Sequence, residues 1–552
     1  MTAVTTTNQI AQTFDKIGDR HPTTMLAAVK PLGKLAASMW IATVLALGQS
    51  AAAQPSSNDV PPKDSSKVID WSAGKFDAIQ RTNPFGLGSD EFAKACDEGS
   101  QIADLNPSPH TLMIPIDILL REHKLTPEEV AMLAAKIAGV HHQKDGDEFL
   151  GLRSEQRKIF EENAGNKIRA LRVSCYACHS NNLFGRQVLG ATNKVVRLSN
   201  FQTVGKRLAS QDVHQNTDDL TSHELFLVNK FRSDIQASPV SPQHKPGLSN
   251  FAPLLSRDEI LQSFRSASAQ VKPIPWWQSK YKSRWLVDGF SSNVNPVLTL
   301  LLSFENGLGS DVYKTSDWLI KNPDVLTSIT TAVFSAEPPR YEDYFKFSSV
   351  ELNSARSGSV LFSDNCSSCH GEYPRTWRTE ESLVTGFDRE SVYYPQPTVG
   401  YDVGTDRRRL LAAAAAEKDQ LEGIEILERS QVKFESLGEY VPPPLVGGWA
   451  SWPYLHNGSV PTLRDLFEAS ANRPKQFYIG PSLSEQTDFD REKNGFPIPA
   501  PLSWRSKDFL YDTSHPGQSN RGHDVGIFVD ESGQPVFTDK EKTDLLNFLK
   551  TL

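Results

Sequence analysis

Two copies of one short motif constrain this chain more than any other feature. The motif is Cys-x-x-Cys-His, and its copies comprise Cys175, Cys178 and His179, and Cys366, Cys369 and His370. Two thiols at positions i and i+3 can lie on one side of a helical turn, where both reach one porphyrin edge. The histidine that follows then projects toward the iron, so the pattern is typical of c-type haem attachment. We predict two covalently bound haem c groups, each with its motif histidine as an iron ligand.

Zinc is the alternative ligand, since Cys-x-x-Cys pairs also bind that ion. The pairs of a four-cysteine zinc site usually lie close together in sequence. Here the first motif ends at residue 179 and the second begins at residue 366, which favours haem. The fifth cysteine, Cys96, is predicted to be a buried, inert thiol, because free cysteine is among the most buried residue types.

The first residues have the features of an export signal. In residues 1–53 a polar, positively charged stretch precedes an apolar run, and small residues mark a cleavage site after Ala53. An uncleaved membrane anchor is the alternative, although the run is shorter than the roughly 20 residues of a membrane span. Residues 54–66 are rich in Pro and Ser and predict a flexible leader. We expect a periplasmic or secreted protein of a Gram-negative type bacterium that is not an integral membrane protein after signal removal.

Helical patterns with long irregular connections make up most of the remaining sequence, and strand-like alternation is sparse. We predict a mainly α protein with two cytochrome c-like haem domains, long irregular loops and little β-structure. The proline pair in Glu337–Arg340 marks the expected boundary, because proline stops a helix and stiffens a linker. This places an N-terminal haem domain at 67–340 and a C-terminal cytochrome c domain at 341–552.

Three segments carry clear helix signals. Thr126–Ala138 begins with a capping threonine and a proline, Ser348–Phe362 precedes the second motif, and Thr538–Glu541 is a capping box that begins the last helix. A haem motif just after one helix, followed by a C-terminal helix, resembles the cytochrome c fold. In that fold the two terminal helices cross at a glycine and an aromatic residue. The residues here that match those positions are Gly358, Phe362 and Phe548.

The second axial ligand determines what each iron does, because an open position binds O₂ or peroxide whereas two strong ligands favour electron transfer. His523 stands in a loop before the last helix, where it is expected over the open face of the second haem. His456 stands in the segment Pro453–Leu463. A methionine ligand to the second haem is disfavoured, because no methionine follows the first motif.

The segment Pro453–Leu463 resembles the characteristic loop of bacterial di-haem cytochrome c peroxidases and their relatives. Together with Pro275–Gly289, Glu337–Arg340 and Gly522-His523, it makes the chain most similar to the di-haem rubber oxygenase branch, over residues 165–552. The resemblance implies that the first haem is the reactive one, with His179 as its proximal ligand. It also implies that His370 and His523 ligate the second haem, and that His456 bonds a propionate of that haem. Calcium occurs in related peroxidases, but no ligand cluster in the sequence supports it here.

Two groups of residues near the middle of the chain leave alternatives open. Trp276, Trp277 and Trp285 lie between the motifs in sequence, and indoles there could relay electrons or simply anchor the core. The cationic residues beside them could pair with haem propionates or be solvated; they are Lys280, Lys282 and Arg284.

The main hypothesis is a periplasmic di-haem oxidoreductase in which one haem activates H₂O₂ or O₂ and the other transfers electrons. Its partner would be a small redox protein or a quinol-linked donor or acceptor. The alternatives are a rubber-oxygenase-like dioxygenase that cleaves an alkene or polyisoprene, and a non-catalytic di-haem electron carrier. A net charge of −8 without clustered Lys and Arg argues against a nucleic-acid partner.

Overall fold

The fold is built around irregular loops between short helices and strands, seen here in a computed structural model. It describes residues 82–105, 108, 114–115, 139, 152–157, 168–197, 225, 229, 231–233, 236, 246–248, 269–292, 295–307, 310–417, 423–430 and 432–552. Contacts group residues 69–552 into one unit, and the following description concerns that unit. The predicted export signal, the leader and the helix at 126–138 lie outside the described residues.

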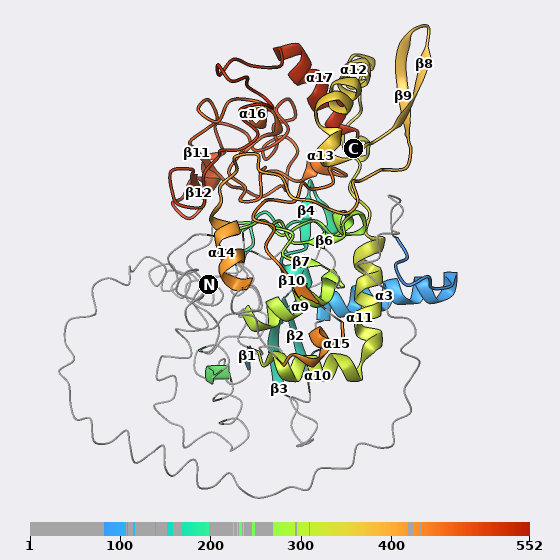
Figure 1. Cartoon of the computed structure of the whole chain (residues 1–552), viewed down its shortest axis with the longest axis vertical. Coiled ribbons are helices and arrows are strands. Elements are labelled where there is room, and N and C mark those ends of the chain that lie inside the picture. Colours follow the sequence, from blue (N-terminus) through green and yellow to red (C-terminus); the bar gives the residue numbers. More distant parts are fainter. Residues whose placement is uncertain are drawn as a thin grey trace, which may run out of the picture. The chain divides into compact units, whose positions relative to one another are not determined.

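Two capped helices carry the C-terminal part of the fold and lie side by side in Figure 1. Helix α12 spans Ser349–Asn365 and helix α17 spans Asp539–Lys550. Each begins with a capping box, in which a hydroxyl side chain and a glutamate three residues later satisfy each other's free backbone N–H groups. Both predicted helices are therefore present.

The two helices cross at the predicted residues. A Cβ atom on Gly358 would lie 2.0 Å from the backbone oxygen of Asp544, so only glycine allows the backbones to approach this closely. The rings of Phe362 and Phe548 pack beside the crossing with their centres 5.3 Å apart. This is the contact expected of a cytochrome c fold.

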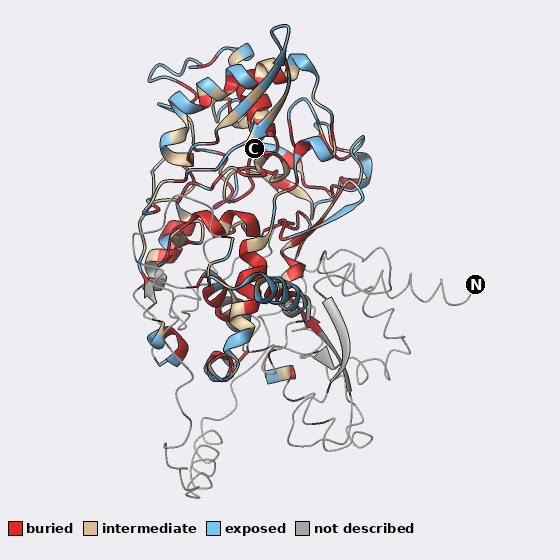
Figure 2. Ribbon diagram, turned by 90° about the vertical axis from the view of Figure 1, so that its right-hand side faces the viewer, coloured by how far each residue is buried: buried red, intermediate tan, exposed pale blue. Residues whose placement is uncertain are grey.

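The other α-helices are short, and the described part of the chain holds none that is long and apolar enough to cross a membrane. Their bounds are Ser89–Leu105 (α3), Pro296–Gly307 (α9), Val312–Lys321 (α10), Pro323–Ser335 (α11), Ser367–His370 (α13), Arg408–Glu417 (α14), Glu425–Arg429 (α15) and Leu463–Leu466 (α16). Single 3₁₀ turns occur at Cys175–Ala177 (η3), Trp276–Tyr281 (η5), Tyr341–Asp343 (η6), Gly448–Ala450 (η7) and Leu502–Trp504 (η8). Figure 2 colours these helices by burial, and in α11 all seven residues from Ser328 to Phe334 are buried.

Small antiparallel sheets fill more of the described chain than the sequence led us to expect. Their strands are Ile114–Pro115 (β1), Leu152–Arg157 (β2), Ile168–Val173 (β3), Ser180–Leu183 (β4), Arg186–Leu189 (β5), Arg284–Trp285 (β6), Ser291–Ser292 (β7), Arg375–Glu380 (β8), Leu383–Arg389 (β9), Lys433–Phe434 (β10), Gln476–Tyr478 (β11) and Leu510–Asp512 (β12). They pair in the orders β1-β3-β2, β10-β7-β6, β11-β12, β4-β5 and β8-β9. The prediction of a mainly α protein is thus only partly right. Hairpins such as β8–β9 escaped prediction because their strands are mostly exposed and lack an alternating apolar pattern.

The region around the first motif does not clearly show a second cytochrome c fold. The motif enters a 3₁₀ turn, η3, and continues directly into the β4–β5 hairpin. Strand β10 also returns to pair with β7, so a segment after residue 341 completes a sheet begun before residue 340. The boundary at 340/341 stays a prediction.

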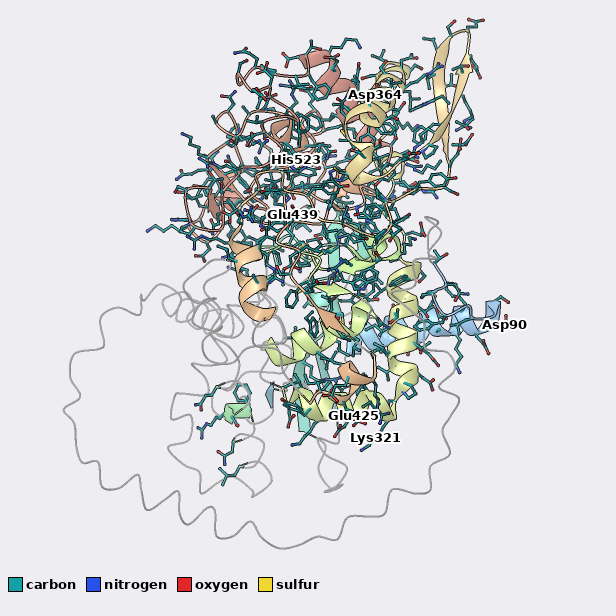
Figure 3. The ribbon with its side chains drawn as sticks, viewed as in Figure 1. Asp90, Lys321, Asp364, Glu425, Glu439 and His523 are labelled. Atoms are coloured by element: carbon teal, nitrogen blue, oxygen red, sulfur yellow. The ribbon has the colours of Figure 1, made fainter. Side chains whose placement is uncertain are left out.

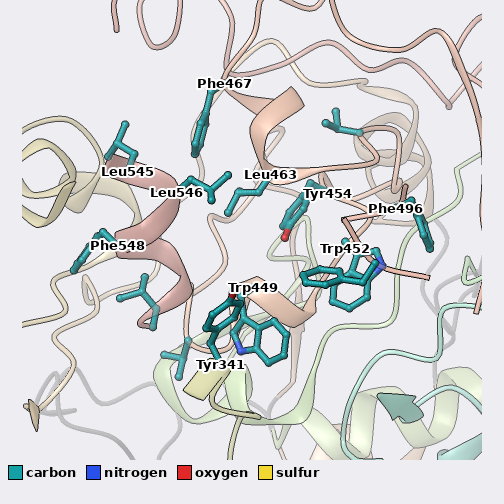
Figure 4. Close-up of a cluster of buried hydrophobic side chains, with 14 of the residues drawn as sticks. Tyr341, Trp449, Trp452, Tyr454, Leu463, Phe467, Phe496, Leu545, Leu546 and Phe548 are labelled. Atoms are coloured by element: carbon teal, nitrogen blue, oxygen red, sulfur yellow. The ribbon is translucent and has the colours of Figure 1, made fainter. Parts of the chain in front are cut away.

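Two clusters of buried apolar side chains form the core. One contains Trp277, Trp449 and Trp452 with the crossing of α12 and α17, and part of it is shown in Figure 4. The other contains Trp276 and Trp285 together with residues of α9, α10 and α11. Sequence neighbours Trp276 and Trp277 therefore belong to different clusters.

Candidate haem-binding sites

The two motifs share one backbone conformation. In each, the carbonyl of the first cysteine accepts hydrogen bonds from the N–H groups of the second cysteine and of the histidine. The distances are 3.2 and 3.0 Å at Cys175 and 3.3 and 3.0 Å at Cys366. One helical turn thus carries both thiols and the imidazole, as haem attachment requires, and no motif cysteine is held in a disulfide.

A cavity of about 280 Å³ opens beside the second motif, and its wall includes Cys366, Cys369 and His370. Most of the wall is apolar and comes from the terminal helices and from the loops between them. The apolar side chains include Val287, Phe362, Leu445, Leu463, Leu466, Phe467, Ile527, Phe528, Leu545 and Leu549. A flat, largely apolar cofactor fits such a lining.

His523 faces His370 across this cavity, which both residues line. Their ring centres are 6.1 Å apart and their planes are inclined by 25°. Because a metal–imidazole bond is about 2 Å long, two imidazoles on opposite sides of one metal ion place their ring centres about 6 Å apart. The spacing of the two rings is compatible with two imidazoles that bind one metal ion.

Hydrogen bonding and burial prepare both rings for this role. His370 Nδ1 lies 3.0 Å from the backbone oxygen of Pro443, so Nδ1 carries the proton and Nε2 keeps its lone pair for a metal. Burial lowers the pKa of His370. The pKa of His523 is lowered to about 3, mainly by burial and to a smaller extent by the nearby His370 and Arg473. Both imidazoles are therefore neutral at ordinary pH.

His523 stands on an irregular loop rather than on a helix, among the loops of the C-terminal part in Figure 3. Its backbone has a φ of +57°, which is uncommon for a residue other than glycine. Its N–H donates to the backbone oxygen of Val403 at 2.9 Å. Contacts from outside the loop thus help to fix the direction of the ring.

Two lysines, Lys272 and Lys282, also line the cavity. Lys272 Nζ donates to the backbone oxygens of Ser451 and Pro453 at 2.6 and 2.5 Å. No described residue accepts a hydrogen bond from the Lys282 ammonium, and the carboxylate that acts on it electrostatically, Asp288, is itself engaged by Arg409 at 2.7 Å.

Burial lowers the pKa of Lys272 to about 7 and that of Lys282 to about 8. A ligand carboxylate close to either ammonium group would favour its charged form. The propionates of a haem are carboxylates of this kind, so Lys272 and Lys282 are candidates to bind them.

This arrangement separates the three cationic residues suggested for the propionates. Lys280 donates to Glu337 at 2.8 Å, and Arg284 donates to Glu435 at 3.0 Å, so both are paired with a carboxylate. Neither residue lines the cavity. Only Lys282 faces it. Lys272 was missed, and its one signal in the sequence is a lysine directly before Pro273 in an apolar stretch.

His456 also lines the cavity, but it is bound to Tyr440. The Tyr440 hydroxyl donates to the backbone oxygen of Asp406 and therefore accepts from His456 Nε2, 3.0 Å away. Burial lowers the pKa of His456 to about 3, and its Nδ1 has no hydrogen-bond partner among the described residues. A neutral His456 offers a lone pair at Nδ1, so a bond from there to a propionate requires the imidazolium. Its predicted role stays a prediction.

His179 of the first motif packs against Trp276, with the ring centres 5.7 Å apart. Burial lowers the pKa of His179 to about 4, so this imidazole is also neutral. Backbone bonds join the same elements, because Gly190 N–H donates to the oxygen of His179 and Trp276 N–H donates to the oxygen of Gly190. Within the described part of the chain, no second histidine ring packs opposite His179.

Trp277 reaches the other site. Its indole N–H donates to the backbone oxygen of Val446 at 2.9 Å, and the neighbouring residues Leu445 and Gly448 line the second-motif cavity. Gly447 has a φ of +64°, and a Cβ there would lie 3.0 Å from the indole nitrogen. Adjacent tryptophans thus contact the surroundings of different motifs. Cys96 is half-buried rather than buried, and its thiol contacts the Ser335 hydroxyl at 3.3 Å.

Residues 438–478 match the family described as RoxA-like, cytochrome c-like. Residues of this range between Tyr440 and Phe467 line the cavity, and the range contains the whole segment Pro453–Leu463. The match supports a relationship to the rubber oxygenases and a haem-binding redox function.

Two uncharacterized proteins of Sinorhizobium fredii (strain NBRC 101917 / NGR234) are also similar. The protein y4iJ is 28% identical over a match that covers 39% of this chain and 41% of the relative. The protein y4iM is 28% identical over 37% of this chain and 49% of the relative. The chain spans less than half the length of the curated relatives it matches.

Proposed function

We propose that this chain is an exported di-haem c-type oxidoreductase. Cys366 and Cys369 would attach a haem that transfers electrons, and Cys175 and Cys178 would attach a haem that reacts with H₂O₂ or O₂. The observation that carries the proposal is the placement of His370 and His523, 6.1 Å apart, across a cavity that also exposes the two second-motif cysteines. Haem c bound at these sites would supply reversible one-electron chemistry.

His370 and His523 would both hold the iron at the second site. An iron held by two strong ligands would be suited to electron transfer rather than to binding O₂ or peroxide. The hydrogen bond to Pro443 orients His370, and Lys272 and Lys282 would bind the propionates.

His179 is assigned as the proximal ligand at the first site, and the resemblance of the chain to the rubber oxygenases supports a reactive haem there. Trp276 packs against His179, and Trp277 bonds to the wall of the second cavity. The two adjacent indoles therefore span the distance between the surroundings of the two sites, which supports a role in electron relay. Their burial in two core clusters fits the alternative role of core anchors equally well.

The similarity to RoxA-like proteins favours an oxygenase that acts on an alkene or a polyisoprene. A peroxidase that takes electrons from a small redox protein or a quinol-linked donor is the second candidate, because the Pro453–Leu463 loop resembles that of the di-haem peroxidases. Export to the periplasm belongs to both versions of the proposal.

Steady-state turnover of the purified protein separates these candidates. Consumption of H₂O₂ with oxidation of a reduced cytochrome indicates a peroxidase, and O₂ uptake with cleavage of polyisoprene or a smaller alkene indicates an oxygenase. Electron paramagnetic resonance of the oxidised protein tests for a non-catalytic carrier. If every iron is low-spin, and neither azide nor cyanide changes the spectrum, the enzymatic proposal fails.

A further inference from the structure

Arg473 is an arginine whose side chain is fully buried, although no buried carboxylate among the described residues pairs with it. Its guanidinium donates instead to backbone oxygens, at distances from 2.5 to 3.0 Å. The acceptors are Leu466, Glu468, Asn520 and Gly522. The carboxylate of Asp524 lies 3.5 Å away and is partly exposed.

These four carbonyls belong to two separate segments. Residues 466–468 comprise the last residue of helix α16 and the two that follow it, and Leu466 and Phe467 form part of the cavity wall. Residues 520–522 directly precede His523. The planar guanidinium has five N–H groups in a fixed fork, which lets one side chain bond both segments at once; a lysine ammonium has no such fork. Arg473 thus links residues 520–522, which precede His523, to residues 466–468 by hydrogen bonds.

The backbone of this loop has a conformation that needs such support. Gly522 has a φ of +115°, and a Cβ there would lie 2.4 Å from the hydroxyl of Thr405. His523 follows in the left-handed region. Residues other than glycine persist in that region where their surroundings over-determine it. Other contacts also hold the loop: the His523 N–H donates to Val403, and Asp524 accepts from the N–H groups of Ser470 and Gly522 at 2.6 and 3.2 Å.

We infer that Arg473 is the positioning residue that holds His523 at its distance from His370, and that it thereby sets the six-coordinate state of the second haem. This inference rests on the proposed ligation by His523. Arg473 itself bonds only to backbone oxygens and to Asp524, so its effect on the iron passes through the loop.

The test compares Arg473→Met and Arg473→Lys in the full-length haem-loaded protein. The methionine removes the charge and every donor, and the lysine keeps the charge but loses the fork. We expect part of the second haem to change from low-spin to high-spin, more in the methionine variant than in the lysine variant. Added imidazole should restore the low-spin signal, since it can occupy the position that His523 leaves. Electron paramagnetic resonance and visible absorption measure both effects.

Arg464→Gln is the matched control. Arg464 lies in helix α16, just before residues 466–468, but its guanidinium contacts Asp539 and Glu468 near the surface, away from the His523 loop. This variant should keep the low-spin spectrum of the second haem. A general loss of stability would lower the unfolding temperature without creating a signal that imidazole reverses.

His523→Ala distinguishes the inference from the proposal beneath it. If His523→Ala leaves the second haem low-spin, the assigned ligation is wrong. If His523→Ala gives a high-spin haem but both Arg473 variants stay fully low-spin, the ligation stands and the role of Arg473 is rejected. Should the methionine variant not fold, the lysine variant alone decides between these outcomes.

Discussion

The two Cys-x-x-Cys-His motifs have nearly the same backbone geometry and very different surroundings. Each makes one helical turn with the same pair of hydrogen bonds. The second motif lies beside a cavity in which the ring centres of His370 and His523 are 6.1 Å apart. Two lysines also line this cavity. The first motif leads into a hairpin and packs against an indole. The motif therefore specifies attachment, whereas elements distant in sequence specify what an attached haem can do.

Removal of the attachment cysteines should have the largest effect on this comparison. Replacing Cys366 and Cys369 with Ala is expected to remove the haem whose two histidine ligands give a low-spin spectrum. Replacing Cys175 and Cys178 should spare it. Mass spectrometry of the denatured protein would count the haems, and paramagnetic resonance would show which signal is lost. If both double variants lose the same signal, the two sites do not differ as described.

Gly358→Val should disrupt the second site alone. Its side chain would collide with the backbone of Asp544, where even a Cβ has only 2.0 Å. Such overpacking costs about 3 kcal/mol or more when the backbones cannot separate. Thermal unfolding should show the loss, and the low-spin signal of the second haem should weaken first. Ser357→Ala, at an exposed neighbour on the same helix, is the control and should change neither.

Trp277→Phe and Trp276→Phe sharpen the comparison, because each indole contacts one site. The first change leaves the backbone oxygen of Val446 without its indole donor and should cost about 1–3 kcal/mol. It should also alter the absorption of the second haem, whereas Trp276→Phe should alter that of the first. Rapid-mixing measurements of electron exchange between the haems would follow the relay. If the rate is unchanged in both variants, the tryptophans are core anchors only.

Lys272→Met should have the smallest effect, which depends on pH. In the protein without haem the pKa of Lys272 is about 7, below its ordinary value of 10.5. Between these values the unfolded chain binds a proton that the folded chain releases, so the free energy of unfolding should rise with pH from about 7 to 10.5. The methionine variant should flatten this rise, and a bound propionate should do the same. Unfolding temperatures with and without haem, measured across this range, test the effect.

Local sequence signals predicted the terminal helices well. The capping box of the last helix lies within a short stretch, and Gly358, Phe362 and Phe548 lie at the helix crossing as expected. His523 was singled out from its loop before the last helix, and its ring does lie opposite that of His370. These features depend either on neighbours in sequence or on a loop whose pattern is distinctive.

Features that depend on tertiary contacts were missed or only partly recognised. Lys280, Lys282 and Arg284 are close in sequence, but on and after a 3₁₀ turn they point to different partners, and only Lys282 reaches the cavity. Lys272 also lines the cavity, and its hydrogen bonds go to Ser451 and Pro453, far along the chain. The exposed strands of β8–β9 carry little alternation of apolar residues, so period-two reasoning could not find them.

The membership of Trp276 and Trp277 in two different cores limits how this protein can be divided. A gene cut at the proline pair near residue 340 would encode two fragments, and each would lack part of its own interior. The C-terminal fragment would lose the indole that bonds to Val446, and the N-terminal fragment would lose strand β10 from its sheet. Such halves could not be exchanged freely with those of other cytochromes. A gene duplication or recombination event would preserve the fold only if it carried both halves together.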